Sequence, residues 1–234
     1  FSLIMEPINF ITVCTEKYTS DYANKSLSMF KRNFRGEFKS FCITDKSKEL
    51  NKEYTSIGKQ NNFNGWWNKI SIFDQNLPYE NTLYIDLDLL IMNDITKVIS
   101  FAMNNIHNYE IACFGDHIGW KGIKFGSALM FFNQAKMKWL YNNFIINIDN
   151  NMKTEGGDQV WIGKHLTNVL YLENHFSNLV KSLKFDLSQK SIDGSKLIMP
   201  ANIEKNFMML NCHGRPKPHQ LEEMGWPPIK NIWR

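Results

Sequence analysis

Short apolar runs that suit β-strands alternate along this chain with segments whose apolar residues recur at helical spacing. The run Ile8–Cys14 predicts a buried first strand, and Phe38–Thr44 predicts a second strand. Between them, Ser20–Phe34 has the spacing of a helix with one buried face. This alternation is typical of an α/β fold. The same reasoning predicts strands at Thr82–Ile85, Tyr109–Phe114, Ser127–Phe132 and Met208–Cys212, and helices at Gly65–Gln75, Asn133–Ile146 and Gly157–Leu166.

Other segments are predicted from their polarity and their proline content. The polar stretch Lys46–Asn64 is expected to form a loop with at most one short helix. The helix predicted after it is expected to bury Trp66, Ile70 and Phe73. The tail Gly225–Arg234 is too rich in proline for a helix and is expected to wrap across the body of the protein.

Composition limits the class of protein. The chain has 234 residues, 43% hydrophobic and 14% aromatic, which is enough for the core of one domain. No run approaches the roughly 20 apolar residues of a membrane span, and the first residues lack the basic lead of a signal peptide. Three of the four cysteines lie in apolar runs, which predicts buried, reduced thiols and a cytoplasmic location.

The net charge of +4 is mild, and lysines are spread along the whole chain. No block of like charges and no nucleic-acid-binding motif is found, so we expect no nucleic-acid partner. A modest positive excess also suits a protein that binds a phosphorylated small molecule. Charge alone does not decide between these partners.

The sharpest chemical feature is Asp86-Leu87-Asp88 at the end of a predicted strand. If the strand continues, the two carboxylates point the same way and Leu87 turns into the core. Two charges at a buried strand end are costly unless a cation compensates them. A divalent cation that also bridges diphosphate oxygens is the natural compensator. The alternative to a cation site is that the two aspartates lie in a solvated turn, where acidic residues are common.

A second feature is the sequence NCHGRPKP at residues 211–218. His213 is a metal-type ligand, although a lone histidine is more often structural. Lys217 lies between two prolines that restrict it, and its ammonium is a suitable point charge for phosphate. Gly214 permits a close approach of the backbone to a ligand. The segment therefore predicts a stiff loop that binds a metal and a phosphate.

The motifs around Asp86, Asp158 and Lys217 resemble those of the nucleotide-sugar glycosyltransferases of the GT-A fold. The most similar group is the glycogenin-like glycosyltransferase family 8, with its bacterial and viral relatives. The resemblance extends along most of the chain, and the order and spacing of its pieces make it specific. These pieces are Thr12-x-x-Thr15-x-x-Tyr18, Gly65-Trp66-Trp67-Asn68-Lys69, Asp86-Leu87-Asp88, Phe125-Gly126-Ser127-Ala128, Gly157-Asp158-Gln159 and Gly214-x-x-Lys217-Pro218.

The resemblance implies an architecture: an α/β fold with a single GT-A (Rossmann-like) domain, in which helices flank a mixed central sheet. Residues of about 1–92 would form the nucleotide-binding half, which ends in the D-x-D motif. Residues of about 93–218 would form the sugar and acceptor half, and 219–234 the tail.

The resemblance also implies a metal and diphosphate site. Asp86 would contact the ribose and the metal, and Asp88 and His213 would complete the site for Mn²⁺ or Mg²⁺. Lys217 would hold the diphosphate. The other nucleotide and phosphate contacts would come from Thr15, Tyr18, Lys69 and Gly214.

On the sugar side, the resemblance implies that Asp158 and Gln159 lie against the donor sugar as the catalytic residues. Ser127 belongs to the strand that follows on the same side. Asp116 and Trp120 lie in a glycine-rich loop that is a candidate for the acceptor cleft or a lid.

The chain departs from the family pattern at two positions. The family's metal-binding histidine lies three residues before the motif glycine, where this chain has Asn211. On a strand, positions 211 and 213 face the same side, and we favour His213 because imidazole binds manganese better than a carboxamide does. The second departure is Gly126, where the family often has an asparagine that contacts the sugar. Its absence is expected to widen the pocket.

The expected function is metal-dependent transfer of a hexose from a nucleoside-diphosphate sugar, by default a UDP-sugar, to a carbohydrate or other hydroxyl acceptor with retention. One alternative is a binding relative of the fold without turnover. Another is a metal-dependent nucleotidyl or phosphoryl transferase, although no phosphate-binding glycine loop accompanies the acidic pair. Structural alternatives also remain: Tyr18 as a cap of the first helix, and Asp158 as a helix N-cap.

Overall fold

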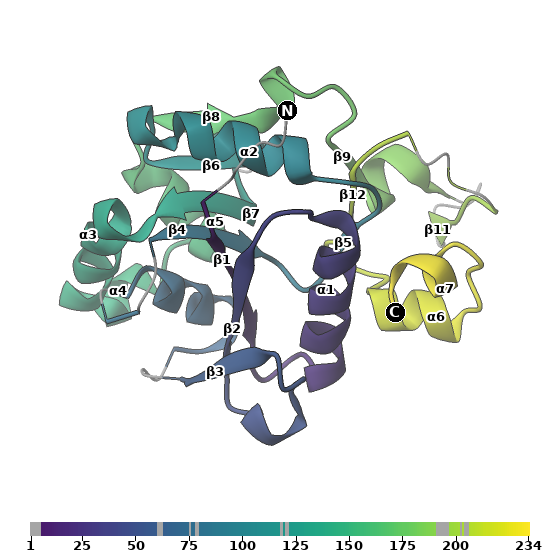
Figure 1. The fold of residues 1–234 in the computed structure, drawn as a ribbon, viewed down its shortest axis with the longest axis horizontal. Coiled ribbons are helices and arrows are strands. Elements are labelled where there is room, and N and C mark those ends of the chain that lie inside the picture. The colour runs from purple at the N-terminus through teal and green to yellow at the C-terminus, as the bar shows by residue number, and fades with distance from the viewer. Residues whose placement is uncertain are drawn as a thin grey trace.

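The computed structural model describes residues 6–59, 63–74, 76–77, 80–117, 119, 122–190, 197–201, 203 and 206–234. Its centre is a seven-stranded sheet in the order β3-β2-β1-β4-β7-β6-β8 (Figure 1). Parallel pairs join the first four strands, whereas β7 runs antiparallel to both β4 and β6. The mixed α/β class is therefore confirmed. The strands are β1 (Ile8–Cys14), β2 (Phe38–Thr44), β3 (Tyr54–Gly58), β4 (Asn81–Ile85), β6 (Ile111–Gly115), β7 (Phe125–Asn133) and β8 (Val169–Tyr171).

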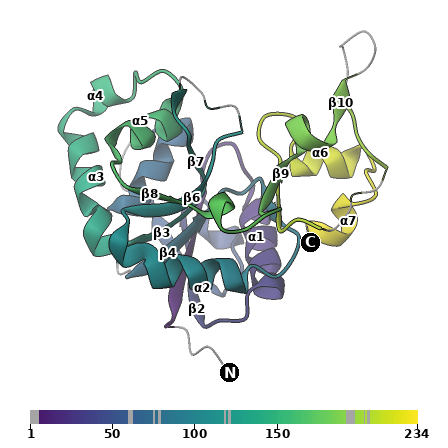
Figure 2. The same ribbon diagram turned by 90° about the horizontal axis from the view of Figure 1, so that it is seen from above.

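Helices cover both faces of this sheet because its strands are apolar on both sides. Phe10 and Ile11 are neighbours on β1, yet they belong to two different buried clusters. Figure 2 shows α2 on one side of the sheet and α3 and α5 on the other. The helices of the Phe10 side are α1 (Ser20–Asn33) and α2 (Thr96–Asn105), and those of the Ile11 side are η2 (Gly65–Phe73), α3 (Gln134–Ile146) and α5 (Gly157–His165).

A smaller three-stranded sheet lies beside the main one and consists of β5 (Leu89–Ile91), β12 (Met209–Asn211) and β9 (Val180–Ser182). Strand β5 follows β4 closely along the chain, so it links the two sheets. The remaining elements are η1 (Ser47–Glu49), η3 (Ile106–Asn108), α4 (Ile148–Asn151), η5 (Leu172–Asn174), η6 (Leu183–Leu187), β10 (Gln189–Lys190), β11 (Leu197–Ile198), α6 (Pro218–Glu223) and α7 (Ile229–Ile232).

The C-terminal segment packs against α1. The guanidinium of Arg32 donates hydrogen bonds of 2.7 Å to the carbonyl oxygens of Ile232 and Arg234. The rings of Trp233 and Tyr22 lie edge to face with centroids 4.8 Å apart. These contacts hold α6 and α7 next to α1 (Figure 1).

The predicted bounds of β1 and β2 coincide with those observed, and α1 ends one residue before the predicted end. Several of the described elements were missed, and two of them belong to the main layers of the fold. The segment predicted as a loop before residue 64 contains β3, and α2 (Thr96–Asn105) was not predicted. The expectation of a tail without a helix was wrong, because four residues form α7 after the two prolines.

The segment Gly65–Phe73 is a 3₁₀-helix, and its buried face differs from the predicted one. Ile70 and Phe73 are buried as expected, whereas Trp66 is 56% exposed and Trp67 takes the buried position. The prediction assumed 3.6 residues per turn, but a 3₁₀-helix has three residues per turn and rotates the faces.

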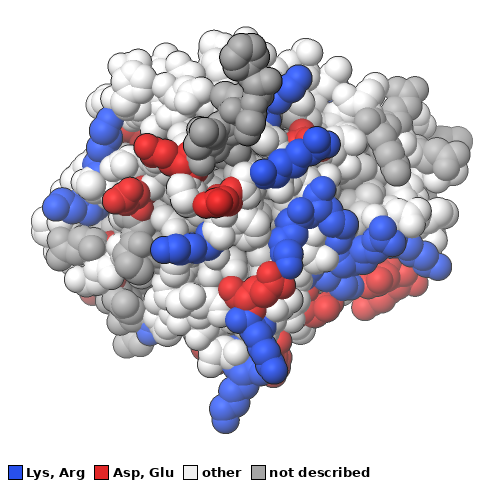
Figure 3. All heavy atoms as spheres, viewed as in Figure 1, with Lys and Arg blue, Asp and Glu red and all other residues white. Residues whose placement is uncertain are grey.

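The four cysteines are buried and free, as predicted. None of the helices in the described part of the chain combines the length and the apolar character that a membrane crossing requires. On the face shown in Figure 3, acidic and basic side chains of the described residues are intermixed.

Strand β7 approaches the end of β6 closely at Gly126. A Cβ atom at this position would lie 2.5 Å from the carbonyl oxygen of Phe114 and 3.2 Å from the amide nitrogen of Asp116. The register between β6 and β7 also shifts here, between Cys113 and Gly115. Gly126 is therefore required by the backbone, and the expectation that it widens the pocket was wrong: the space of the missing side chain is filled by β6.

We predict that Gly126→Ala lowers the free energy of unfolding by about 1–3 kcal/mol, because the backbone of β6 must move to admit a methyl group. Urea denaturation measures this loss. Gly58→Ala is the matched control on β3, since nothing lies within 4 Å of its Cβ position, and it should be neutral or stabilise by about 0.4–1 kcal/mol. Equal effects at the two glycines would contradict the close approach.

Candidate active site

A pocket of about 540 Å³ opens where the carboxyl ends of β1 and β4 lie side by side. This edge is where chain connections leave the sheet in opposite directions, the usual ligand site of open α/β sheets. The loop after β1, the turn after β4, η2 and the start of α6 supply its walls. Seven of the residues predicted for the site line it: Thr15, Tyr18, Lys69, Asp86, Asp88, Gly214 and Lys217.

The acidic pair lies on a tight turn and not on a continuing strand. The amide nitrogen of Leu89 donates to the carbonyl oxygen of Asp86 at 3.1 Å, so the chain reverses between β4 and β5. Leu87 is buried, as predicted. Both Asp86 and Asp88 still reach the same pocket, because the turn brings them together at its wall.

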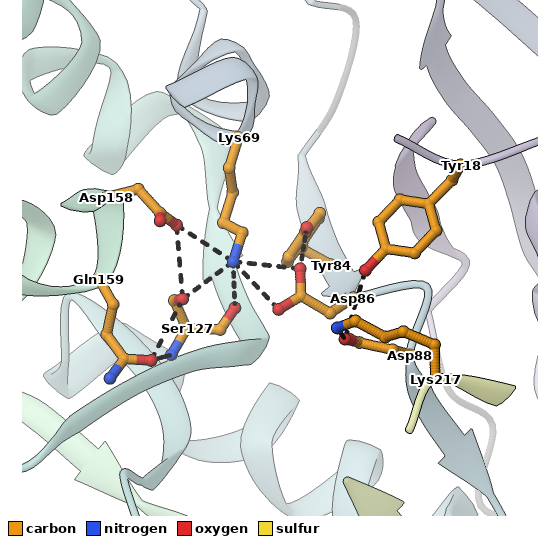
Figure 4. Close-up of polar contacts among 9 residues, drawn as sticks. All are labelled: Tyr18, Lys69, Tyr84, Asp86, Asp88, Ser127, Asp158, Gln159 and Lys217. Carbon is orange, nitrogen blue, oxygen red and sulfur yellow. Dashed lines mark hydrogen bonds and ion pairs between the residues drawn. The ribbon is translucent and has the colours of Figure 1, made fainter. Parts of the chain in front are cut away.

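Lys69 lies at the centre of a buried ionic cluster (Figure 4). Its ammonium is 3.1 Å from the carboxylate of Asp86 and 3.1 Å from that of Asp158, and it donates to Ser127 Oγ at 2.9 Å. Burial opposes the charge of Lys69, but the two carboxylates outweigh it and raise its pKa. Burial raises the pKa of Asp86, and Lys69 and Tyr84 act in the opposite direction. One cation therefore joins η2, the end of β4, β7 and α5.

A second ionic contact lies at the other carboxylate. Lys217 and Asp88 form an ion pair across 129 residues of sequence, and the hydroxyl of Tyr18 donates to the same carboxylate at 3.3 Å. Burial and the nearby Asp88 and Asp86 raise the pKa of Tyr18, so its hydroxyl stays a donor. In Figure 4 these three side chains converge at one end of the cluster.

The predicted catalytic residues form a second row behind Lys69. Asp158 contacts Lys69, and Gln159 Oε1 accepts a hydrogen bond of 3.1 Å from the amide of Ser127. Neither of them, nor Ser127, lines the pocket directly. The alternative role of Asp158 as a helix cap does not apply, since Gly156 occupies the N-cap position of α5.

The two candidate metal ligands, Asn211 at the end of β12 and His213 just after it, differ in their surroundings. Asn211 Oδ1 is buried without a hydrogen-bond partner. Neither residue lines the pocket. Nε2 of His213 is 2.8 Å from Ser182 Oγ, and its ring stacks on His117 with centroids 5.8 Å apart. Burial and the neighbouring His117 lower the pKa of His213.

The segment is nevertheless close to the acidic pair, since the amide of Cys212 donates to the carbonyl oxygen of Asp88 at 3.0 Å. Within the described ranges, no three side chains of His, Cys, Asp or Glu are grouped so that they could hold a metal ion.

The loop between β6 and β7 contributes less. Asp116 starts it, and its amide donates to the carbonyl oxygen of Lys124 at 2.6 Å, but Asp116 does not line the pocket. Trp120 lies outside the described residues.

Several pocket residues were missed from the sequence. Trp66 was expected in the core, and His219 was given no role, yet both line the pocket. His219 follows Pro218 directly, so its proximity to Lys217 was the available signal. Glu16 joins two walls of the pocket, because its carboxylate accepts from the amide of Gly65 at 3.1 Å. Lys17, Tyr84, Arg215 and Gln220 complete the set of missed polar residues.

Solved structures of glycosyltransferases share this fold. Glycosyltransferase GlyE of Streptococcus pneumoniae TIGR4 matches with a TM-score of 0.67 and 14% identity, over 96% of this chain and 60% of GlyE. Galactosyltransferase LgtC, in complex with donor and acceptor sugar analogues, matches with a TM-score of 0.65 and 12% identity, over 96% of this chain and 94% of LgtC. The chain therefore has the fold of GT-A glycosyltransferases, as the sequence motifs predicted.

Among curated proteins, the chain is similar to glycogenin of Komagataella phaffii (strain GS115 / ATCC 20864). The two are 34% identical over 92 residues, which is 39% of this chain and 21% of glycogenin, so the match spans about a fifth of that relative. No known family model matches the chain. The predicted resemblance to family 8 of the GT-A glycosyltransferases thus agrees with both comparisons.

We predict that Lys69→Met lowers the free energy of unfolding by about 3–5 kcal/mol at pH 7, because it leaves two buried carboxylates without their cation. The control Lys31→Met breaks an exposed pair with Glu53 and should cost about 0–1 kcal/mol. Urea denaturation compares the two.

The stability defect of Lys69→Met should depend on pH. Loss of Lys69 raises the pKa of Asp86 further in the folded state. A carboxyl group with a raised pKa destabilises the folded state at a pH where the group is ionised in the unfolded chain, and this cost disappears at low pH. The stability defect should therefore shrink as the pH falls towards about 4. The double variant Lys69→Met/Asp158→Asn should regain part of the loss at pH 7. A defect independent of both pH and Asp158 would contradict the ionic cluster.

Proposed function

We propose that this chain is a metal-dependent glycosyltransferase that moves a hexose from a nucleoside-diphosphate sugar to a hydroxyl acceptor. The observation that supports it best is the pair Asp86 and Asp88, each held by a different lysine, in the wall of one pocket. A departing diphosphate is stabilised by positive charge. Two carboxylates can bind a cation for this purpose, and an ammonium group can contact the phosphates. A uridine nucleotide is proposed as the donor because it is the default of the family that the chain resembles.

The diphosphate is proposed to lie between Asp88 and the start of α6. Lys217 belongs to this wall together with Arg215 and Gly214. With a cation on Asp88, the ammonium of Lys217 would turn from the carboxylate to the diphosphate oxygens. The nucleoside would then extend along the loop after β1, past Thr15 and Tyr18.

The donor atoms at Asp88 fit a hard divalent cation. Asp86 and Asp88 supply carboxylate oxygens. Oδ1 of Asn211 is buried without a hydrogen-bond partner, and Asn211 is paired with Leu89, the residue after Asp88. Oxygen ligands suit Mg²⁺ and Mn²⁺. We therefore favour Asn211 over His213 as the third protein ligand. When bound, the cation would neutralise negative charge that develops on the leaving diphosphate.

The donor sugar is proposed to lie beside Lys69. The carboxylate of Asp158 is held by this ammonium, and Gln159 is held by the amide of Ser127. Neither group lines the pocket, so both would act on the sugar indirectly, through Lys69, which Asp158 and Ser127 hold at the pocket wall. Retention is proposed from the family resemblance, with the leaving phosphate accepting the proton of the acceptor hydroxyl.

Asp88→Asn tests the metal site. The wild type should show a rise in melting temperature with UDP plus Mn²⁺ that exceeds the rise with UDP alone, since binding to the folded state stabilises it. The variant should lose the metal-dependent part of this shift. Its rate of UDP release from a UDP-sugar should fall by about 10²-fold or more. Asp21→Asn, an exposed aspartate on α1, is the control and should behave as the wild type.

The products separate the candidate functions. A glycosyltransferase releases UDP and a free or transferred hexose, whereas a nucleotidyl transferase releases pyrophosphate or a sugar phosphate. A binding relative without turnover shows the thermal shift and releases neither. A wild type that shows no shift with any nucleotide and Mn²⁺ would rule out the proposal.

The third ligand is tested by comparing Asn211→Ala with His213→Ala. The first should weaken Mn²⁺ affinity in the presence of UDP by about 10-fold to 100-fold, the range typical of lost metal-site support. The second should have a smaller effect, because His213 is hydrogen-bonded to Ser182 outside the pocket. Titration of Mn²⁺ by its electron paramagnetic resonance signal measures both, and the reverse order would assign the ligand to His213.

A further inference from the structure

Trp66 is an exposed aromatic surface inside the pocket. It is 56% exposed and lines the same cavity as Asp86 and Lys69, whereas its neighbour Trp67 is 5% exposed and packs against Phe144. Because the exposed indole lies in the pocket wall, a ligand in the pocket can remove its apolar surface from water. The position of Trp66 thus points to a ligand with an apolar face.

The indole is held in place by its surroundings. A Cβ atom on Gly157 would lie 2.7 Å from Nε1 and 2.9 Å from Cε2 of Trp66, so the ring rests directly on the backbone of this glycine. Gly157 also has a φ of +72°, which L side chains rarely adopt. Lys17, an exposed side chain, has its Nζ 5.3 Å from the ring centroid. A ring fixed in this way binds a ligand with little further loss of conformational entropy.

The ring also lies on the sugar side of the pocket. In a 3₁₀-helix, side chains three residues apart lie one above the other, so Trp66 and Lys69 share one face of η2. The backbone under the ring is that of Gly157, and the next residue, Asp158, is bonded to Lys69. Trp66 therefore adjoins the cluster of Lys69 and Asp158.

We propose that Trp66 is the platform on which a pyranose ring of the acceptor stacks, so that the acceptor is a carbohydrate or glycoside. A pyranose has one face of C–H groups that matches the face of an indole, and its hydroxyls remain free for polar partners. This inference rests on the proposed function, since the acceptor must lie next to the donor sugar. It adds the chemical class of the acceptor and a residue that selects it.

Saturation-transfer NMR tests the platform directly. Methyl glycosides of glucose, galactose and N-acetylglucosamine, as α and β anomers, serve as probes in the presence of UDP and Mn²⁺. The wild type should transfer saturation to the ring protons of at least one glycoside. Trp66→Ala should lose this signal, and Trp66→Phe should retain most of it. Phe185→Ala removes an aromatic that is 47% exposed outside this pocket, and this control should keep the full signal.

Kinetics then separate the acceptor from the nucleotide. With the glycoside that binds, Trp66→Ala should raise the KM for the acceptor about five- to tenfold, the range of one aromatic contact. In hydrolysis of the UDP-sugar without an acceptor, the KM for the donor should change by a smaller factor than the KM for the acceptor does. If UDP affinity falls instead and the glycoside signal persists, the ring stacks on the base and the proposal is wrong.

The failure of this inference differs from the failure of the proposed function. A wild type that binds UDP with Mn²⁺ and releases UDP, but transfers no saturation to any glycoside, overturns the platform and leaves the glycosyltransferase proposal intact. A wild type that binds no nucleotide overturns both.

Discussion

The ammonium of Lys69 is the point on which the site depends. It lies between the carboxylates of Asp86 and Asp158 and joins four elements that are distant in the sequence. The cluster has more carboxylates than cations around Lys69, so its charges are balanced only as a group. Because each partner fixes the others, the orientation of the second-row residues follows from one cation. This explains how Asp158 and Gln159 are positioned without touching the pocket themselves.

The sequence predicted the sheet more reliably than the short elements around it. Buried strands such as β1 and β2 are marked by continuous apolar runs, which follow from burial on both faces. Strand β3 lies at the edge of the sheet and has exposed positions, so its sequence resembles a loop. The burial of Trp67 in place of Trp66 depends on 3₁₀ geometry, which the spacing of apolar residues alone does not distinguish from an α-helix.

For the site, the sequence motifs lie in the turns and loops that follow the strands. Asp86, Asp88 and Lys217 meet because β4 ends beside β1 and the segment after β12 returns to that edge. The pairing of Lys69 with Asp158 was not predictable, since it depends on the packing of η2 against α5. From the sequence, Gly126 was expected to widen the pocket because it lacks a side chain. The structure shows that a glycine is needed there because the backbone of β6 lies too close for a Cβ atom, and sequence alone does not reveal this contact.

The two walls of the pocket differ in how they are anchored. The carboxylates belong to the central sheet, whereas Lys217 belongs to a segment held on α1 by Arg32 and Trp233. Leu221, Trp226 and Trp233 of this segment are buried in the same cluster as Phe10 of the central sheet. Loosening of the segment from α1 would therefore disturb that side of the core together with the phosphate side of the site.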